Sequence, residues 1–86
     1  MKEQEIGYVS NYFSKVSVAA IEITKGKISL ADTLHFLGYS TDFECKINSI
    51  QIEHKSVSDA GKGDSIGIKV PQRVRKKDKV FKIIKE

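Results

Sequence analysis

The chain has 86 residues, 40% of them hydrophobic and 30% charged, with a net charge of +4. This length suits one domain, and the composition excludes a largely disordered chain as well as collagen-like and proline-rich classes. Cys45 is the single cysteine and cannot form an intramolecular disulfide, which favours a reducing, cytoplasmic location. The polar residues 1–5 are followed by no long apolar run, so we predict neither a signal peptide nor a membrane span.

Short alternating apolar patterns, separated by Gly, Asp, Asn and Ser, run through the chain and predict strands rather than helices. The six predicted strands are, in chain order, about 5–13, 16–24, 33–38, 43–53, 64–70 and 79–85. We expect residues 1–4 to be a flexible N-terminus and residues 5–86 to form one β-barrel domain. Leu34, Phe36, Ile66, Ile68, Val70 and Val80 are expected in its core.

Apolar residues change parity midway through the predicted strands 16–24 and 43–53, so one face of a regular strand cannot hold them all. A β-bulge near Ala19-Ala20 and another near Asn48-Ser49 would bring both sets inside. Because bulges bend strands sharply, they favour a small closed barrel over a flat sheet.

Basic residues concentrate near the C-terminus, where residues 69–85 hold eight Lys or Arg against Asp78 alone. Such a segment is a candidate contact for RNA or another polyanion, although a solubilising loop explains the charge equally well. The candidate polyanion-binding residues are Arg73, Arg75, Lys76, Lys77 and Lys79. Tyr12 and Tyr39 are candidate base-stacking residues, and they would also suit a protein interface.

Motifs for catalysis, nucleotides, metals and cofactors are not found in the sequence. Gly61–Ser65 contains glycine and lysine, but its spacing does not match a phosphate-binding loop. His35 lies between two apolar strand residues and is expected to be an ordinary exposed histidine, without the partner spacing of a metal site. Cys45 is expected to face the core with no base beside it, so we predict a protein that is not an enzyme.

Three segments carry a resemblance to a known family. The first, Gly26–Leu34, is similar to a G-x-I-x-x-G-D-x-L motif. The second, Ile47–Gln51, is similar to V-x-S-I-x. The third, Val57–Ile68, is similar to V-x-x-A-x-x-G-D-x-V-G-L. In order and spacing they resemble the second domain of translational GTPases such as elongation factor Tu, over about residues 5–84. The resemblance implies a closed six-stranded β-barrel of the translation-factor type.

Residues 6–15 and 38–44 narrow the resemblance to small stand-alone translation elongation factor-like proteins and to the C-terminal barrel of collagenase-like peptidases related to tRNA-modification proteins. Ala31 and Lys77 depart from the pattern, because the family usually has glycine before aspartate at both positions. Since glycine adopts positive φ without a steric penalty, these two turns could differ in type.

Together these observations predict a non-enzymatic elongation factor-like module of protein biosynthesis, which docks on RNA, tRNA or the ribosome through its basic C-terminal hairpin. Its affinity would fall steeply with salt. The alternative is a protein–protein interaction module that acts with a collagenase-like peptidase or a tRNA-modification enzyme through an apolar patch, with binding that resists salt.

Overall fold

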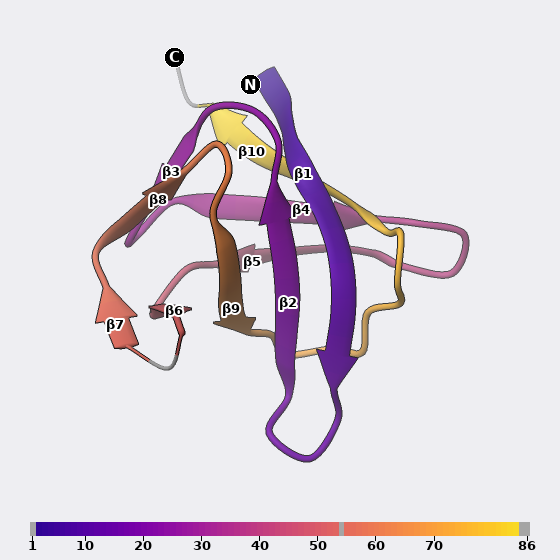
Figure 1. The fold of residues 1–86 in the computed structure, drawn as a ribbon. Helices are drawn as coiled ribbons and strands as arrows, with labels where there is room; N and C mark the ends of the chain where they lie inside the picture. The colour runs from indigo at the N-terminus through magenta and orange to yellow at the C-terminus, as the bar shows by residue number, and fades with distance from the viewer. Residues whose placement is uncertain (1, 54, 85–86) are drawn as a thin grey trace.

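Ten strands connected by turns make up the described part of the chain, residues 2–53 and 55–84 of the computed structural model (Figure 1). They are β1 (Lys2–Phe13), β2 (Val18–Ile23), β3 (Lys27–Ser29), β4 (Thr33–Leu37), β5 (Asp42–Lys46), β6 (Ile50–Ile52), β7 (Lys55–Val57), β8 (Asp59–Gly61), β9 (Ser65–Lys69) and β10 (Lys79–Ile84). None of these residues is helical, so the predicted all-β class is confirmed. The same residues contain no helix that could span a membrane.

Eight strands form one sheet in the order β5-β4-β10-β1-β2-β9-β6-β7, and β3 pairs with β8 in a second, two-stranded sheet. All of these pairings are antiparallel. The large sheet begins at β5 and ends at β7, and these two edge strands are not paired with each other. The predicted closed six-stranded barrel is therefore wrong in strand number and in closure. Figure 1 shows instead that β4 and β5 cross behind β1, β2 and β9 as the bent sheet folds over.

The core lies inside this fold and is built from alternating strand residues. Ile6 and Val9 of β1, with residues of β2, β4, β9 and β10, form one buried cluster. All six residues that we expected in the core are buried there. Phe36 stacks on Phe43 of the neighbouring strand, with ring centroids 5.1 Å apart and planes at 12°. Strand alternation therefore located six of the seventeen buried hydrophobic residues of the described chain.

The bulges lie elsewhere than predicted. Strand β2 alternates regularly, with Ala19, Ile21 and Ile23 buried, while Val16 lies outside the strand and is 58% exposed. The prediction of a bulge near Ala19-Ala20 was wrong because it counted Val16 as a core residue. The irregularities are in β1, between Glu5 and Gly7 opposite β10 and between residues 9 and 11 opposite β2.

The segment 43–53 was predicted as one long strand with a bulge near Asn48-Ser49. It is instead two strands, β5 and β6, which lie at different places in the sheet. Strand β5 pairs with β4 at one edge, whereas β6 lies between β9 and β7. The change of parity therefore marks the boundary between two strands, because Phe43 and Cys45 of β5 and Ile50 and Ile52 of β6 each pack against the core from their own strand.

One four-residue turn occurs three times, and each copy ends in aspartate. The three turns are 29–32, 61–64 and 75–78. In each, the aspartate N–H donates to the carbonyl of the first residue at 3.0–3.2 Å, and the aspartate carboxylate accepts the N–H of that residue at 2.8–2.9 Å. The third residue has positive φ, which is 91° at Gly63, 77° at Ala31 and 75° at Lys77. Ala31 and Lys77 thus keep the left-handed conformation that glycine adopts more easily.

Strand β1 begins at Lys2, the first residue that the structure describes. We expected residues 1–4 to be flexible, but residues 2–4 pair with residues 82–84 of β10, and residue 1 lies outside the described residues. From β1, the Glu3 side chain reaches across β10 to contact His35 of β4.

Candidate functional site

The connection between β9 and β10, residues 70–78, carries most of the predicted binding residues. Val74 is only 1% exposed and anchors this connection in the core, so that Arg73 and Arg75 on either side of it are exposed. The end of the connection is bound to β1, since the N–H of Lys77 donates to the Val9 carbonyl at 2.8 Å and the N–H of Val9 donates to the Asp78 carbonyl at 2.8 Å. The basic residues thus project from a connection whose backbone is fixed to the sheet.

A cavity of about 330 Å³ opens between this connection and the end of β1. The residues that line it are Asn11, Tyr12, Arg73, Val74, Arg75 and Lys76. We call it the basic cavity. It brings together four of the seven predicted site residues from opposite ends of the chain.

The other three predicted residues do not line the basic cavity. Lys77 and Lys79 are exposed nearby on the turn and the first residue of β10. Tyr39 is fully exposed at the turn between β4 and β5. Tyr12, by contrast, is partly buried and packs against the core. The two tyrosines proposed for base stacking therefore occupy different surroundings.

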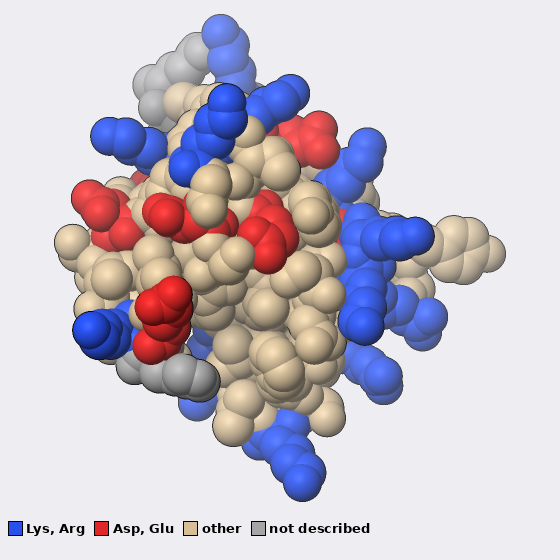
Figure 2. Space-filling view, viewed as in Figure 1, with Lys and Arg blue, Asp and Glu red and all other residues tan. Residues whose placement is uncertain are grey.

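Among the described residues, no ion pair neutralises the positive charge of the five basic site residues. Asp78 is 6% exposed, and its carboxylate accepts the N–H of Arg75 at 2.9 Å. The five basic site residues form no ion pair there, whereas Lys82 pairs with Asp32 at 3.5 Å. Figure 2 shows Lys and Arg side chains gathered on the side where Figure 1 places the chain between β9 and β10, and Asp and Glu side chains on the front face.

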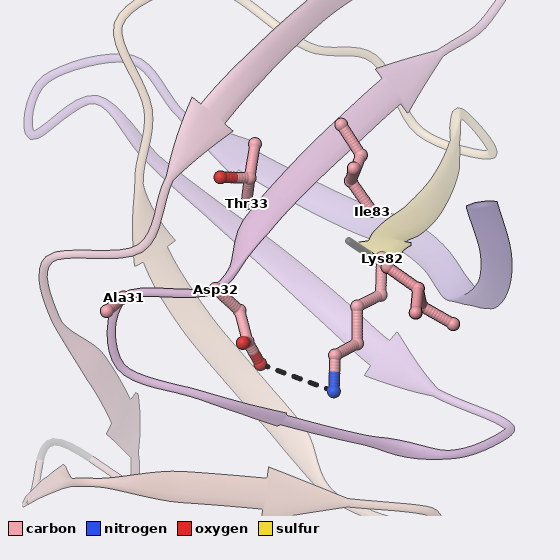
Figure 3. A pocket seen from close by; sticks show the side chains of 6 residues that line it. Ala31, Asp32, Thr33, Lys82 and Ile83 are labelled. Atoms are coloured by element: carbon pink, nitrogen blue, oxygen red, sulfur yellow. Dashed lines mark ion pairs between the residues drawn. The ribbon is translucent and has the colours of Figure 1, made fainter. Parts of the chain in front are cut away.

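A second cavity, of about 390 Å³, lies between the start of β4 and the end of β10. Figure 3 shows Lys82 extending across it toward Asp32. The ammonium group of Lys82 also donates to the Lys27 carbonyl at 3.2 Å. Its charge is thus already satisfied, and this cavity is a weaker candidate for binding an anion.

An apolar groove of about 230 Å³ lies on the outer face of β2 and β9, beside the β1–β2 hairpin. Ala20 of β2 and Gly67 of β9 are register partners, so two small residues form part of its floor. Phe13 lines the groove and is 48% exposed, and the polar residues of the lining are Gln51, Glu53 and Ser65. Val16 lies outside the lining, in the hairpin turn, where its N–H donates to the Phe13 carbonyl at 3.3 Å. Sequence reasoning missed this groove because its lining comes from strands that are far apart in the chain.

His35 forms a charged cluster that the sequence did not predict. Its Nδ1 lies 3.0 Å from Glu3 Oε2, and its Nε2 lies 2.6 Å from Asp42 Oδ1. The hydrogen bonds to Asp42 and to Glu3 raise the pKa of His35 above its ordinary value of 6.5. No signal in the sequence links the imidazole to Glu3, which lies 32 residues away.

Cys45 lies at the margin of the core, partly buried, and burial raises the pKa of its thiol. A raised pKa disfavours the nucleophilic thiolate. Within the described residues, no three His, Cys, Asp or Glu side chains are placed to hold a metal ion.

Comparison with known proteins places this chain beside peptidases. No family model matches it. An uncharacterized protease of Methanocaldococcus jannaschii is 41% identical over 83 residues, which are 95% of this chain and 20% of that protein. A collagenase of Porphyromonas gingivalis is 33% identical over 81 residues, 93% of this chain and 22% of that protein. The chain therefore spans about a fifth of the length of these curated relatives.

Among solved structures, the C-terminal domain of a putative U32 peptidase from Geobacillus thermoleovorans superposes with a TM-score of 0.86 at 18% sequence identity. The match covers 94% of this chain and 93% of that domain, so the two share a fold.

These relatives correct the functional prediction. They are a protease, a collagenase and a peptidase domain, and they overturn the expectation of a translation elongation factor-like module that docks on RNA, tRNA or the ribosome. The expected similarity to the C-terminal domain of collagenase-like peptidases is confirmed. The more specific resemblance to the second domain of elongation factor Tu is not.

Proposed function

We propose that this chain is a non-catalytic accessory domain that acts with the catalytic body of a collagenase-like peptidase through protein–protein contact. The observation that carries the proposal is the similarity to the Methanocaldococcus jannaschii protease. The two sequences are 41% identical over 83 residues, which make up one fifth of that protease. The fold is also that of a peptidase C-terminal domain whose structure was determined as a separate unit. The fold alone would not supply a function, so the contact surface has to be argued from the residues.

The described side chains favour an accessory role over catalysis. Both ring nitrogens of His35 are engaged by carboxylates, which leaves neither free to act as a base for a nucleophile. Cys45 hydrogen-bonds only to backbone carbonyls, at 3.5 Å to Lys46 and 4.0 Å to Lys69. A cysteine nucleophile needs an adjacent base or cation to form its thiolate, and the described residues provide none here.

The apolar groove is the surface that suits contact with a peptidase body. Phe13 of the groove and Val16 of the adjoining hairpin turn are 48% and 58% exposed, although both are apolar. Burying the exposed half of each side chain would contribute about 1 kcal/mol per residue. The small residues Ala20 and Gly67 let a partner approach the sheet closely. The curated relatives have about four fifths of their length outside the matched segment, and this part supplies the proposed occupant of the groove.

The experiment measures binding of this chain to the Methanocaldococcus jannaschii protease from which the matched 83 residues have been deleted. We expect a complex in size-exclusion chromatography and calorimetry that persists at about 0.5 M salt, because an apolar contact is insensitive to screening. The intact protease, whose own segment occupies the site, should bind this chain more weakly.

Variants of the groove test where the contact lies. Phe13→Asp combined with Val16→Asp should weaken the complex at least about tenfold, because it places charge in an apolar contact. Leu30→Asp is the matched control, since Leu30 is 42% exposed on the turn after β3, away from the groove. The proposal is refuted if the truncated protease forms no complex, or if Leu30→Asp weakens the complex as much as the groove variants.

A further inference from the structure

We propose that the basic cavity binds a short acidic segment of polypeptide, with the carboxylates held by Arg73 and Arg75. This inference rests on the proposed function in taking polypeptide as the ligand class. The site and its charge follow from the structure alone. The cavity is separate from the apolar groove, because the two share no lining residue.

Arg73 and Arg75 both bring a guanidinium group to the basic cavity. Arg73 and Arg75 are two residues apart on either side of the buried Val74, and both line the basic cavity. A guanidinium group presents paired N–H donors whose geometry matches the two oxygens of a carboxylate, which an ammonium group does not. Lys76 lines the same cavity and adds a third positive charge. The arrangement therefore favours adjacent carboxylates over a single one.

The cavity is ready to bind without rearrangement of the backbone. The carboxylate of Asp78, the single acid of this segment, is turned inward to the N–H of Arg75 and does not compete for the guanidinium groups. Two backbone hydrogen bonds at 2.8 Å hold the end of the connection to Val9 of β1. Because the backbone is already ordered, a ligand does not have to supply the entropy cost of fixing it.

The dimensions and surroundings favour a short acidic peptide over a nucleic acid strand. A volume of about 330 Å³ holds one or two side chains. Tyr12 lines the cavity but is partly buried against the core, and Tyr39 lies outside it, so the lining offers part of one aromatic ring on which a base could stack. Figure 2 shows acidic side chains on the adjoining front face, and Lys and Arg side chains along the side that holds the cavity.

The test uses this chain alone and a fluorescently labelled hexaglutamate peptide, followed by anisotropy at low and at physiological salt. We expect binding that weakens with salt and that hexaglutamine does not compete for. Arg73→Glu with Arg75→Glu should weaken binding at least about tenfold. Arg73→Lys with Arg75→Lys keeps the charge but removes the paired donors, and it should weaken binding about threefold or more.

The matched control changes the same amount of charge elsewhere. Lys25→Glu with Lys62→Glu replaces two exposed lysines outside the cavity, and it should change hexaglutamate affinity less than about twofold. Equal losses in the two charge-reversal variants would overturn the proposal, as would an absence of hexaglutamate binding at low salt. Single-stranded RNA that binds more tightly than hexaglutamate and displaces it would overturn the choice of polypeptide.

A failure of this inference can be distinguished from a failure of the proposed function. The Phe13→Asp and Val16→Asp variant should keep its hexaglutamate affinity, since neither residue lines the basic cavity. For the unaltered chain, absence of a complex with the truncated protease together with hexaglutamate binding would refute only the accessory role, and the reverse would refute only this inference.

Discussion

Replacing Asp78 by alanine should destabilise the fold more than the same replacement at Asp64, although both aspartates close the same turn. Asp78 is 6% exposed, and its carboxylate contacts Gly38, where a Cβ atom would overlap it. Removing it leaves the partly buried N–H of Arg75 without its partner and opens space against Gly38. An orphaned buried donor and a small void together cost about 2–3 kcal/mol. Asp64 is only partly buried, so water can replace much of its bond to Gly61, at a cost of about 1 kcal/mol.

Urea unfolding measures these free energies. The chain has no tryptophan, so far-ultraviolet circular dichroism is the signal of choice. For a domain of this size, 2–3 kcal/mol corresponds to a fall in Tm of about 8–24 °C. Asp78→Asn keeps an oxygen acceptor and the shape of the side chain, so it should cost less than about 1 kcal/mol. Equal destabilisation by Asp78→Ala and Asp64→Ala would refute the argument from burial.

Three further changes test other parts of the fold. Because the pKa of His35 is raised in the folded state by Asp42 and Glu3, its stabilising contribution is full below its ordinary value of 6.5 and is lost as pH rises through the folded pKa. The difference in unfolding free energy between the wild type and His35→Gln should therefore shrink as pH rises, and a growing difference would contradict this sign. Gly7→Ala should cost more than about 2 kcal/mol in urea unfolding, because its Cβ would overlap a backbone carbonyl of β2. Lys77→Gly should stabilise by about 0.5–1 kcal/mol by relieving a φ of 75°, and a loss of stability would show that no strain is present.

Local rules determined how much of the fold could be predicted. Alternation of apolar residues placed Leu34, Phe36, Ile66 and Ile68 in the core, because neighbouring strand residues point to opposite faces. The same rule failed at Val16, which has an apolar side chain but lies beyond the end of β2. The basic segment was also visible in the sequence, whereas the cavity that it forms with Tyr12 depends on a contact between distant parts of the chain.

The sequence by itself determined that this protein is all-β, where part of its core lies, and that segments rich in Gly, Asp, Asn and Ser separate its strands. These properties depend on residues close together in the chain, through side-chain parity and turn chemistry. Only the tertiary structure decided that the sheet stays open, that β1 carries the bulges, and that Tyr12 meets Arg73 and Arg75 around one cavity. Those properties depend on which strands become neighbours, and pairings between residues far apart in the chain leave no local pattern to read.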